Sequence, residues 1–365
     1  MTAIRDIIAV LEQVAHPSLQ ESYDNAGLIT GNSGNQVSGV LVSLDCTEDV
    51  IEEAIKLKCN LIISHHPILF KPISSLTGKG YVERGLIKAI KNDIALYAIH
   101  TNLDSVHDGV NSVIASKLDL TNCRILRPNS GRLKKIVTFC PVNKADEVRE
   151  AIFHAGAGSI GNYDQCSFNI EGNGTFKGSE SSDPYVGKPG EKHTEREVRI
   201  ESIFHDFRQH EIISALIQAH PYEEVAYDIY PLDNEDPKHG MGMIGELKSE
   251  MSLDDFLSML KSTFNTGIIR HTKAHKKKVK SIAVCGGSGS FLISDAKASK
   301  ADVFVTSDIK YHDFFEADGS IVLADIGHFE SEQFTVEIIA EELTKKFTTF
   351  ATHFSTVNTN PINYF

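Results

Sequence analysis

The sequence has no tryptophan, no pair of closely spaced cysteines and no long apolar run. Because the cysteines are scattered without a Cys-x-x-Cys pair, we expect reduced thiols and no zinc ligation by cysteine. No segment approaches the ~18 consecutive apolar residues of a membrane span. Residues 1–16 also lack the apolar stretch of a signal peptide. These absences predict a cytoplasmic protein without a membrane partner.

Positive charge is also scarce. The 365 residues include 36 Lys and Arg against 49 Asp and Glu, a formal net charge of −13. A negative field of this size argues against a nucleic-acid partner, because it repels phosphate. It would repel a nucleotide as well, unless cations near the site offset the repulsion. Bound metal ions would supply that offset, and the 16 histidines are the best place to look for their ligands.

Hydrophobic periodicity predicts alternating strands and helices at both ends of the chain. Short apolar runs, typical of strands covered on both faces, occur at residues 61–63, 94–99, 303–306 and 321–324. Residues 127–245 break this rhythm with the order strand, helix, strand, strand, helix, strand, which is typical of a ferredoxin-like unit. We therefore predict a discontinuous α/β core domain, residues 1–126 and 246–365, interrupted by an inserted α+β ferredoxin-like domain at 127–245.

Residues of the types that bind metals follow three of these strands: His65, His66, Asp104, His328 and Glu332. In an α/β sheet, ligands collect beyond the carboxyl ends of the strands, so we expect these side chains to meet. If a helix begins near His328, then His328 and Glu332 lie one turn apart on the same face. Each motif alone also has a structural explanation, such as a solvated helix face or a helix cap. Their shared position at strand ends favours a metal site.

Imidazole and carboxylate ligands without thiolate suit Zn²⁺, Mn²⁺, Fe²⁺ or Co²⁺. Five ligands exceed the three that a protein usually gives to one catalytic zinc, so we expect two divalent metal ions bridged by Glu332. Two ions ~3.5–4 Å apart would activate a shared water molecule near neutral pH. Adjacent His65 and His66 on an extended backbone point to opposite sides. That arrangement fits two metals, or one metal and one supporting residue.

Further residues are candidates for supporting roles. His312 also follows a predicted strand and is a candidate catalytic general acid or base, although it would serve equally well as a helix cap. Asp24, Asn25 and His100 are candidates for orienting the ligands. The glycine-rich run at 286–289 is a candidate phosphate cradle, although it lacks the lysine of a P-loop.

Longer motifs carry a resemblance to a known family. They are SYDNAGL (22–28), IISHHPILF (62–70), HTNLD (100–104), GAGSIGNYDQCSF (156–168), HPYEEVAYDIYPL (220–232), TSDIKYHD (306–313) and GHFESE (327–332). Through them nearly the whole chain resembles the dinuclear-metal family of GTP cyclohydrolase 1 type 2 homologues, in its long bacterial form with a PII/CutA-like insert. The resemblance implies that His65, His66, Asp104, His328 and Glu332 are the metal ligands. It also implies a toroidal homohexamer.

The resemblance defines the site more firmly than the reaction. Our first hypothesis is a metal-dependent hydrolase whose small-molecule substrate is a nucleotide or a related heterocycle, with ring opening of GTP as the named candidate. Phosphoester hydrolysis would suit the same paired metals. The alternative is a non-enzymatic, metal-binding regulator or carrier with a ligand-sensing insert. Turnover that is lost on chelation and restored by metal would separate these classes.

Overall fold

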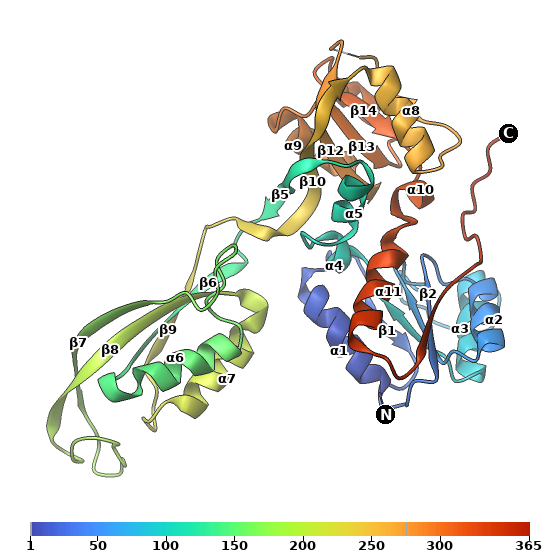
Figure 1. Cartoon of the computed structure of the whole chain (residues 1–365). Helices are drawn as coiled ribbons and strands as arrows, with labels where there is room; N and C mark the ends of the chain where they lie inside the picture. Colours follow the sequence, from blue (N-terminus) through green and yellow to red (C-terminus); the bar gives the residue numbers. More distant parts are fainter. Residues whose placement is uncertain (1, 275) are drawn as a thin grey trace. The chain divides into compact units, whose positions relative to one another are not determined.

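The structure is a computed structural model of the chain and describes residues 2–274 and 276–365. The chain divides into two compact units (Figure 1). The core unit combines Met1–Pro128 with Lys238–Phe365, and the insert is the continuous segment Asn129–Pro237. Among the residues described, no helix is long and apolar enough to cross a membrane.

The first sheet of the core unit is formed by β1 (Gly27–Thr30), β2 (Gly39–Ser43), β3 (Leu61–Ser64), β4 (Ala95–Ala98) and β15 (Ala351–Phe354). Its order is β1-β4-β3-β2-β15, and all strands except β1 run parallel. Figure 1 shows helices on both sides of it, which explains why β2, β3 and β4 are buried throughout. These helices are α1 (Ile4–Val14), α2 (Glu48–Leu57), α3 (Tyr81–Lys91) and α11 (Thr335–Lys346).

The second sheet of the core unit contains β5 (Thr121–Asn129), β10 (Asp236–Met251), β11 (Arg270–His271), β12 (Val279–Ser288), β13 (Val303–Ser307) and β14 (Val322–Asp325). Its order is β11-β14-β13-β12-β10-β5, with β12, β13 and β14 parallel. The other helical elements of the core unit are η1 (Pro17–Leu19), α4 (Thr101–Asp104), α5 (Val110–Lys117), α8 (Leu253–Thr263), η4 (Ser290–Leu292), α9 (Ile293–Ala298), η5 (Asp313–Ala317) and α10 (His328–Glu332). The mixed α/β class is as predicted, but the core has two sheets.

Sequence periodicity missed β5 and most of β10 because glycines interrupt the apolar pattern of β10. Gly240 shows why β10 contains glycines. A Cβ at this position would lie 2.2 Å from the backbone oxygen of Arg127, on the neighbouring strand β5. Close approach of two backbones therefore requires glycine at the place where a strand pattern would need a side chain.

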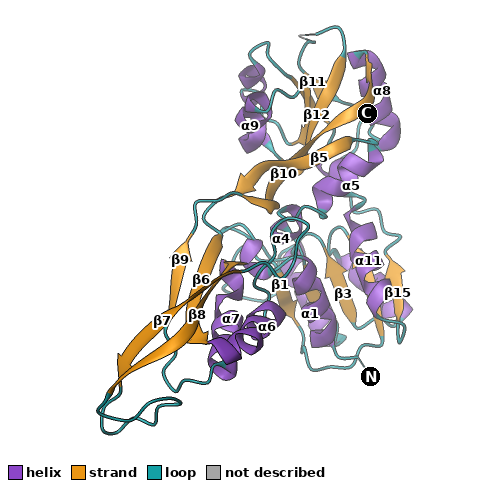
Figure 2. Cartoon of the chain, turned by 60° about the vertical axis from the view of Figure 1, so that its left-hand side comes forward, coloured by secondary structure: helices purple, strands orange, loops and turns teal. Residues whose placement is uncertain are grey.

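The insert contains β6 (Leu133–Pro141), η2 (Val142–Lys144), α6 (Ala145–His154), β7 (Phe168–Lys177), β8 (Lys192–His205), η3 (Asp206–Arg208), α7 (Gln209–Ala219) and β9 (Tyr227–Pro231). The strands form an antiparallel sheet in the order β7-β8-β6-β9. Both long helices cover the same face of this sheet (Figure 2). Ile136, Ile200, Ile212 and Leu216 belong to the apolar cluster between sheet and helices, and all four are fully buried.

Replacing residues 129–237 by a short Gly/Ser linker should leave the core unit folded, because two large buried clusters of this unit consist of core residues alone. Deleting 127–245 should instead unfold it, since that deletion removes Met243, Ile244 and Gly245, which pair with β12. Circular dichroism during heating should show a cooperative transition for the first variant only. Loss of the transition in both variants would mean that the core depends on the insert.

Candidate metal centre

The structure brings all five predicted ligands together in the core unit. His65 and His66 directly follow β3, Asp104 ends α4 just after β4, and α10 runs from His328 to Glu332 after β14. The ligand atoms of His65, Asp104 and Glu332 lie within 4.8 Å of one another, and so do those of His66, His328 and Glu332. Two groups of three thus share one carboxylate, Glu332.

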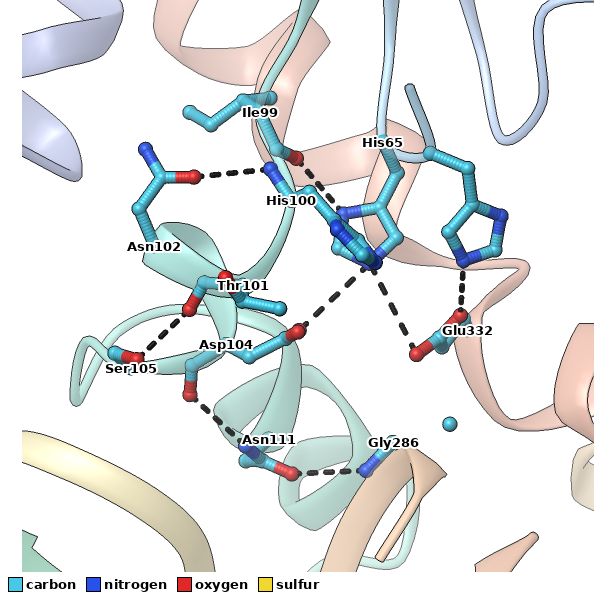
Figure 3. A network of polar contacts seen from close by, with 12 residues as sticks. His65, Ile99, His100, Thr101, Asn102, Asp104, Ser105, Asn111, Gly286 and Glu332 are labelled. Atoms are coloured by element: carbon cyan, nitrogen blue, oxygen red, sulfur yellow. Dashed lines mark hydrogen bonds and ion pairs between the residues drawn. The ribbon is translucent and has the colours of Figure 1, made fainter. Parts of the chain in front are cut away.

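The first group, drawn in Figure 3, contains buried polar atoms without a hydrogen-bond partner. His65 Nε2 lies 3.7 Å from Asp104 Oδ1 and 3.9 Å from Glu332 Oε1. Both His65 Nε2 and Asp104 Oδ1 are buried without a hydrogen-bond partner. Burial lowers the pKa of His65 to about 4, so the ring is neutral and offers a lone pair. Because unsatisfied buried polar atoms are costly, this arrangement fits a cation between them.

The second group is more tightly packed. Glu332 Oε2 lies 3.0 Å from His66 Nε2 and 3.1 Å from His328 Nε2, and these two nitrogens are 3.3 Å apart. Burial acts to lower the pKa of both histidines, but hydrogen bonds to carboxylates outweigh it. They raise the pKa of His66 to about 9 and that of His328 to about 11. Protons therefore bind here in the absence of metal, and a divalent cation would compete with them.

Each of the three histidines in these groups makes a hydrogen bond with the ring nitrogen that faces away from the cluster. Each ring donates its Nδ1 proton to an oxygen: His65 to Ile99 O (2.9 Å), His66 to Asp45 Oδ1 (2.8 Å) and His328 to Asp308 Oδ2 (2.6 Å). Such a bond sets the tautomer and the ring orientation, so Nε2 is left to face the cluster. This is the usual arrangement of histidines that bind metals.

Sequence reasoning missed Asp45 and Asp308. Both follow the carboxyl end of a parallel strand, β2 and β13, so the rule that found the five ligands would also have found them. Of the predicted orienting residues, Asp24 accepts the Nδ1 proton of His100 at 2.7 Å. His100 has a ring nitrogen within 4.8 Å of ligand atoms of both His65 and His66, which makes it a further candidate for contact with a metal or a substrate.

Asn25 and His312 lie differently from the predicted ligands. The side chain of Asn25 donates to Leu69 O at 2.6 Å and therefore holds a loop. His312 is exposed, and its ring contacts those of Tyr311 and Phe315 at centroid distances of 5.2 and 6.3 Å. The structure does not bring His312 among the side chains that line the cavity at the cluster. After β13, the residue that contacts a predicted ligand is Asp308.

The glycine-rich run at 286–289 makes room for Glu332. Gly287 has a φ of +61°, and a Cβ there would lie 2.3 Å from Glu332 Oε1. The backbone amides of Gly286 and Gly287 donate to side-chain oxygens of Asn111 and Ser331, each at 3.0 Å. Protein oxygens already occupy these two amides, so a phosphate cradle at 286–289 stays a prediction that would depend on Ser288 and Gly289.

A cavity of about 620 Å³ opens onto the cluster, a volume that suits a small molecule. His66, His100, Asp104, His328 and Glu332 are part of its wall. Four exposed aromatic side chains also line it: Tyr23, Phe70, Tyr81 and Phe291. Within the described parts of the chain, its wall includes no lysine or arginine. The cavity thus combines flat apolar surfaces with a cluster of metal-binding groups.

These features define a mixed α/β protein with His, Asp and Glu clusters that could bind metal. Residues 2–361 match the sequence model of the family Duf34/NIF3 (NGG1p interacting factor 3). The chain belongs to this family.

Similar proteins span nearly the same length. The GTP cyclohydrolase 1 type 2 homolog of Halalkalibacterium halodurans is 40% identical over 342 residues, covering 93% of this chain and 91% of the relative. The homolog of the same name from Bacillus subtilis is 37% identical over 346 residues, covering 94% of this chain and 91% of the relative. The crystal structure of a Bacillus cereus protein related to NIF3 has a TM-score of 0.88 at 38% identity, covering 100% of this chain and 99% of its own. A Staphylococcus aureus structure has a TM-score of 0.79 at 31% identity, with the same coverage.

Asp308→Asn should weaken metal binding by roughly 10–100-fold, because the ring of His328 loses its charged acceptor. Asp318→Asn is a matched control: both aspartates have a left-handed backbone, with φ of 55° and 45°, which asparagine tolerates. Competition with a fluorescent chelator would measure both affinities. Equal affinities in the two variants would contradict the assigned role of Asp308.

Proposed function

We propose that this chain binds two divalent metal ions, one between His65, Asp104 and Glu332 and the other between His66, His328 and Glu332. The observation that carries this proposal is the buried pair His65 Nε2 and Asp104 Oδ1, which have no hydrogen-bond partner and both face Glu332. Nitrogen and oxygen donors without sulfur favour Zn²⁺, Mn²⁺, Fe²⁺ or Co²⁺.

The proposed activity is metal-dependent hydrolysis of a nucleotide or a related heterocycle. When bound, paired metals supply Lewis acidity and an activated water molecule. Aromatic side chains such as Phe70 and Phe291 offer flat surfaces on which a base could stack. Because no lysine or arginine is found among the described residues that line the cavity, the metals alone would offset the charge of a phosphate. The names of the relatives make GTP the first substrate to test.

Two histidines are candidates for proton transfer in this reaction. His100 lines the cavity, and Asp24 holds its Nδ1, so its Nε2 is available to hold or accept a proton there. His312, the residue predicted from sequence, lies in an exposed segment and would need to move or to act in an assembled protein. We propose a homohexamer with a PII/CutA-like insert, as the resemblance implies. The scattered cysteines support a cytoplasmic location, and the order of strands and helices supports a ferredoxin-like insert. Light scattering would test the six-chain assembly.

The wild-type protein should hold close to two divalent ions per chain, and Glu332→Ala should remove at least one, because both groups of ligands use Glu332. Glu337→Ala is the matched control, since Glu337 is an exposed residue of α11 that pairs with Lys117. Elemental analysis after dialysis against metal-free buffer would measure the content. A wild-type protein without metal, purified with added metal and no chelator, would overturn the proposal.

Replacing a metal ligand should change metal content and turnover together, whereas replacing a proton carrier should change turnover alone. His65→Ala should lose metal and activity together, because a ligand is missing. The turnover rates of His312→Ala and His100→Ala should each be compared with that of the wild-type protein, at full metal content. Replacing the residue that acts as general acid or base should slow turnover by ~10²–10⁴-fold without loss of metal. Unchanged turnover removes that histidine from the mechanism.

The outcome for the wild-type protein separates the hydrolase from its alternative. A fully metallated protein that turns over no nucleotide or phosphoester would favour a metal-binding regulator or carrier.

A further inference from the structure

The C-terminal tail, residues 355–365, forms part of the wall of the cavity at the candidate metal centre. It follows β15, an edge strand of the first sheet, and contains no helix or strand (Figure 1). Its first residues are anchored to α2, where the hydroxyls of Ser355 and Thr356 donate to Glu53. Four later residues line the cavity: Thr359, Asn360, Pro361 and Ile362.

Thr359 contacts the carboxylate that orients His66. Its hydroxyl donates to Asp45 Oδ2, while Asp45 Oδ1 accepts the Nδ1 proton of His66 at 2.8 Å. Within the described residues, Thr359 is the only hydrogen-bond donor to Oδ2, so the carboxylate would be free to rotate without it. A chain of hydrogen bonds therefore runs from the tail to a candidate metal ligand.

The next residue, Asn360, contacts the helix that carries the other two ligands of the second group. Its Nδ2 donates to Glu330 Oε1 at 3.2 Å. Glu330 is only 7% exposed and belongs to α10, between His328 and Glu332 in the sequence. Two consecutive residues of the tail thus bind the carboxylate behind one ligand and the helix that presents the other two.

The first group of ligands is held without the tail. His65 is oriented by a backbone oxygen, since its Nδ1 donates to Ile99 O at 2.9 Å. In the part of the chain that is described, no residue of the tail forms a hydrogen bond with His65 or Asp104. The contacts of the tail are therefore specific to one of the two proposed metal positions.

We infer that Thr359 and Asn360 are positioning residues for the metal position formed by His66, His328 and Glu332. This inference rests on the proposed two-metal centre. The tail fixes the imidazole ring and the helix before a cation arrives, so less ordering opposes binding. A tail that only stabilised the fold would have no preference between the two positions.

Calorimetric titration of the full-length, metal-free protein with Zn²⁺ tests the inference by replacing one hydroxyl. Thr359→Val removes the donor to Asp45 and keeps the shape of the side chain, so one ion should bind ~10-fold more weakly. The affinity of the other ion should stay as in the wild type. Thr359→Ser keeps the hydroxyl and should restore tight binding of both ions.

Thr356→Val is the matched control for this titration. It removes a threonine hydroxyl that donates to a carboxylate of the same tail's anchor, Glu53, away from the ligands. This variant should bind both ions like the wild type. Equal affinities of Thr359→Val and Thr356→Val, or equal weakening of both ions by Thr359→Val, would overturn the inference.

A double-mutant cycle shows whether Thr359 acts through Asp45. Asp45→Ala should weaken one ion by roughly 10–100-fold, because the ring of His66 loses its acceptor. Adding Thr359→Val to this variant should cause no further loss, since the hydroxyl then has no carboxylate to hold. Additive losses would show that Thr359 does not act through Asp45 and would contradict the inference.

The contact of Asn360 with α10 is tested in the same titration. Asn360→Leu has a similar shape but lacks the donor to Glu330, so it should weaken the same ion as Thr359→Val. Asn363→Leu is its control, at an exposed residue of the tail that does not line the cavity. If the two leucine variants bind metal equally, Asn360 has no positioning role.

Crystal structures of the metal-free proteins give a measurement that is independent of the proposed function. In Thr359→Val, the Asp45 carboxylate should leave the position from which it accepts the His66 proton at 2.8 Å. An unchanged contact would overturn the inference, even if the wild type holds two ions. A wild type that binds no metal would instead overturn the proposed function, and this structural comparison would still decide the inference.

Discussion

Two carboxylates, the half-buried Asp104 and the buried Glu332, lie close together, and this concentration of negative charge constrains the structure around it. Burial and the charge of Glu332 raise the pKa of Asp104 well above its usual range. Burial would also raise the pKa of Glu332, but hydrogen bonds from His328 and His66 hold it well below its usual range. Such a site is stable only if positive charge is shared within it. Divalent cations would supply that charge in place of protons.

Both sheets of the core unit contribute to this cluster. β3 and β4 of the first sheet lead to His65, His66 and Asp104, while β14 of the second leads to His328 and Glu332. Because the backbone at each strand end is fixed by the ladder, the side chains need little additional ordering to meet. Distant parts of the sequence therefore complete one site, and neither sheet holds all five ligands.

Much of the site could be predicted because buried parallel strands produce short apolar runs, whose ends mark where functional residues such as His65 and Asp104 begin. The strand β10 of the second sheet could not be predicted in full, since it carries Gly240, Gly242 and Gly245, where side chains would define a strand pattern. Asp45 and Asp308 could have been found as candidates from their positions after β2 and β13, but their roles depend on where His66 and His328 point in three dimensions. Periodicity carries no information about such long-range hydrogen bonds.

The central claim is that Glu332 joins two metal ions in one centre. X-ray absorption spectroscopy of the protein loaded with two equivalents of Co²⁺ or Zn²⁺ tests it most directly, because scattering reports both the ligands and any neighbouring metal. The account predicts imidazole and carboxylate ligands and a metal–metal distance of about 3.5–4 Å. A spectrum with sulfur ligands, or with no metal–metal scattering at full loading, would contradict it.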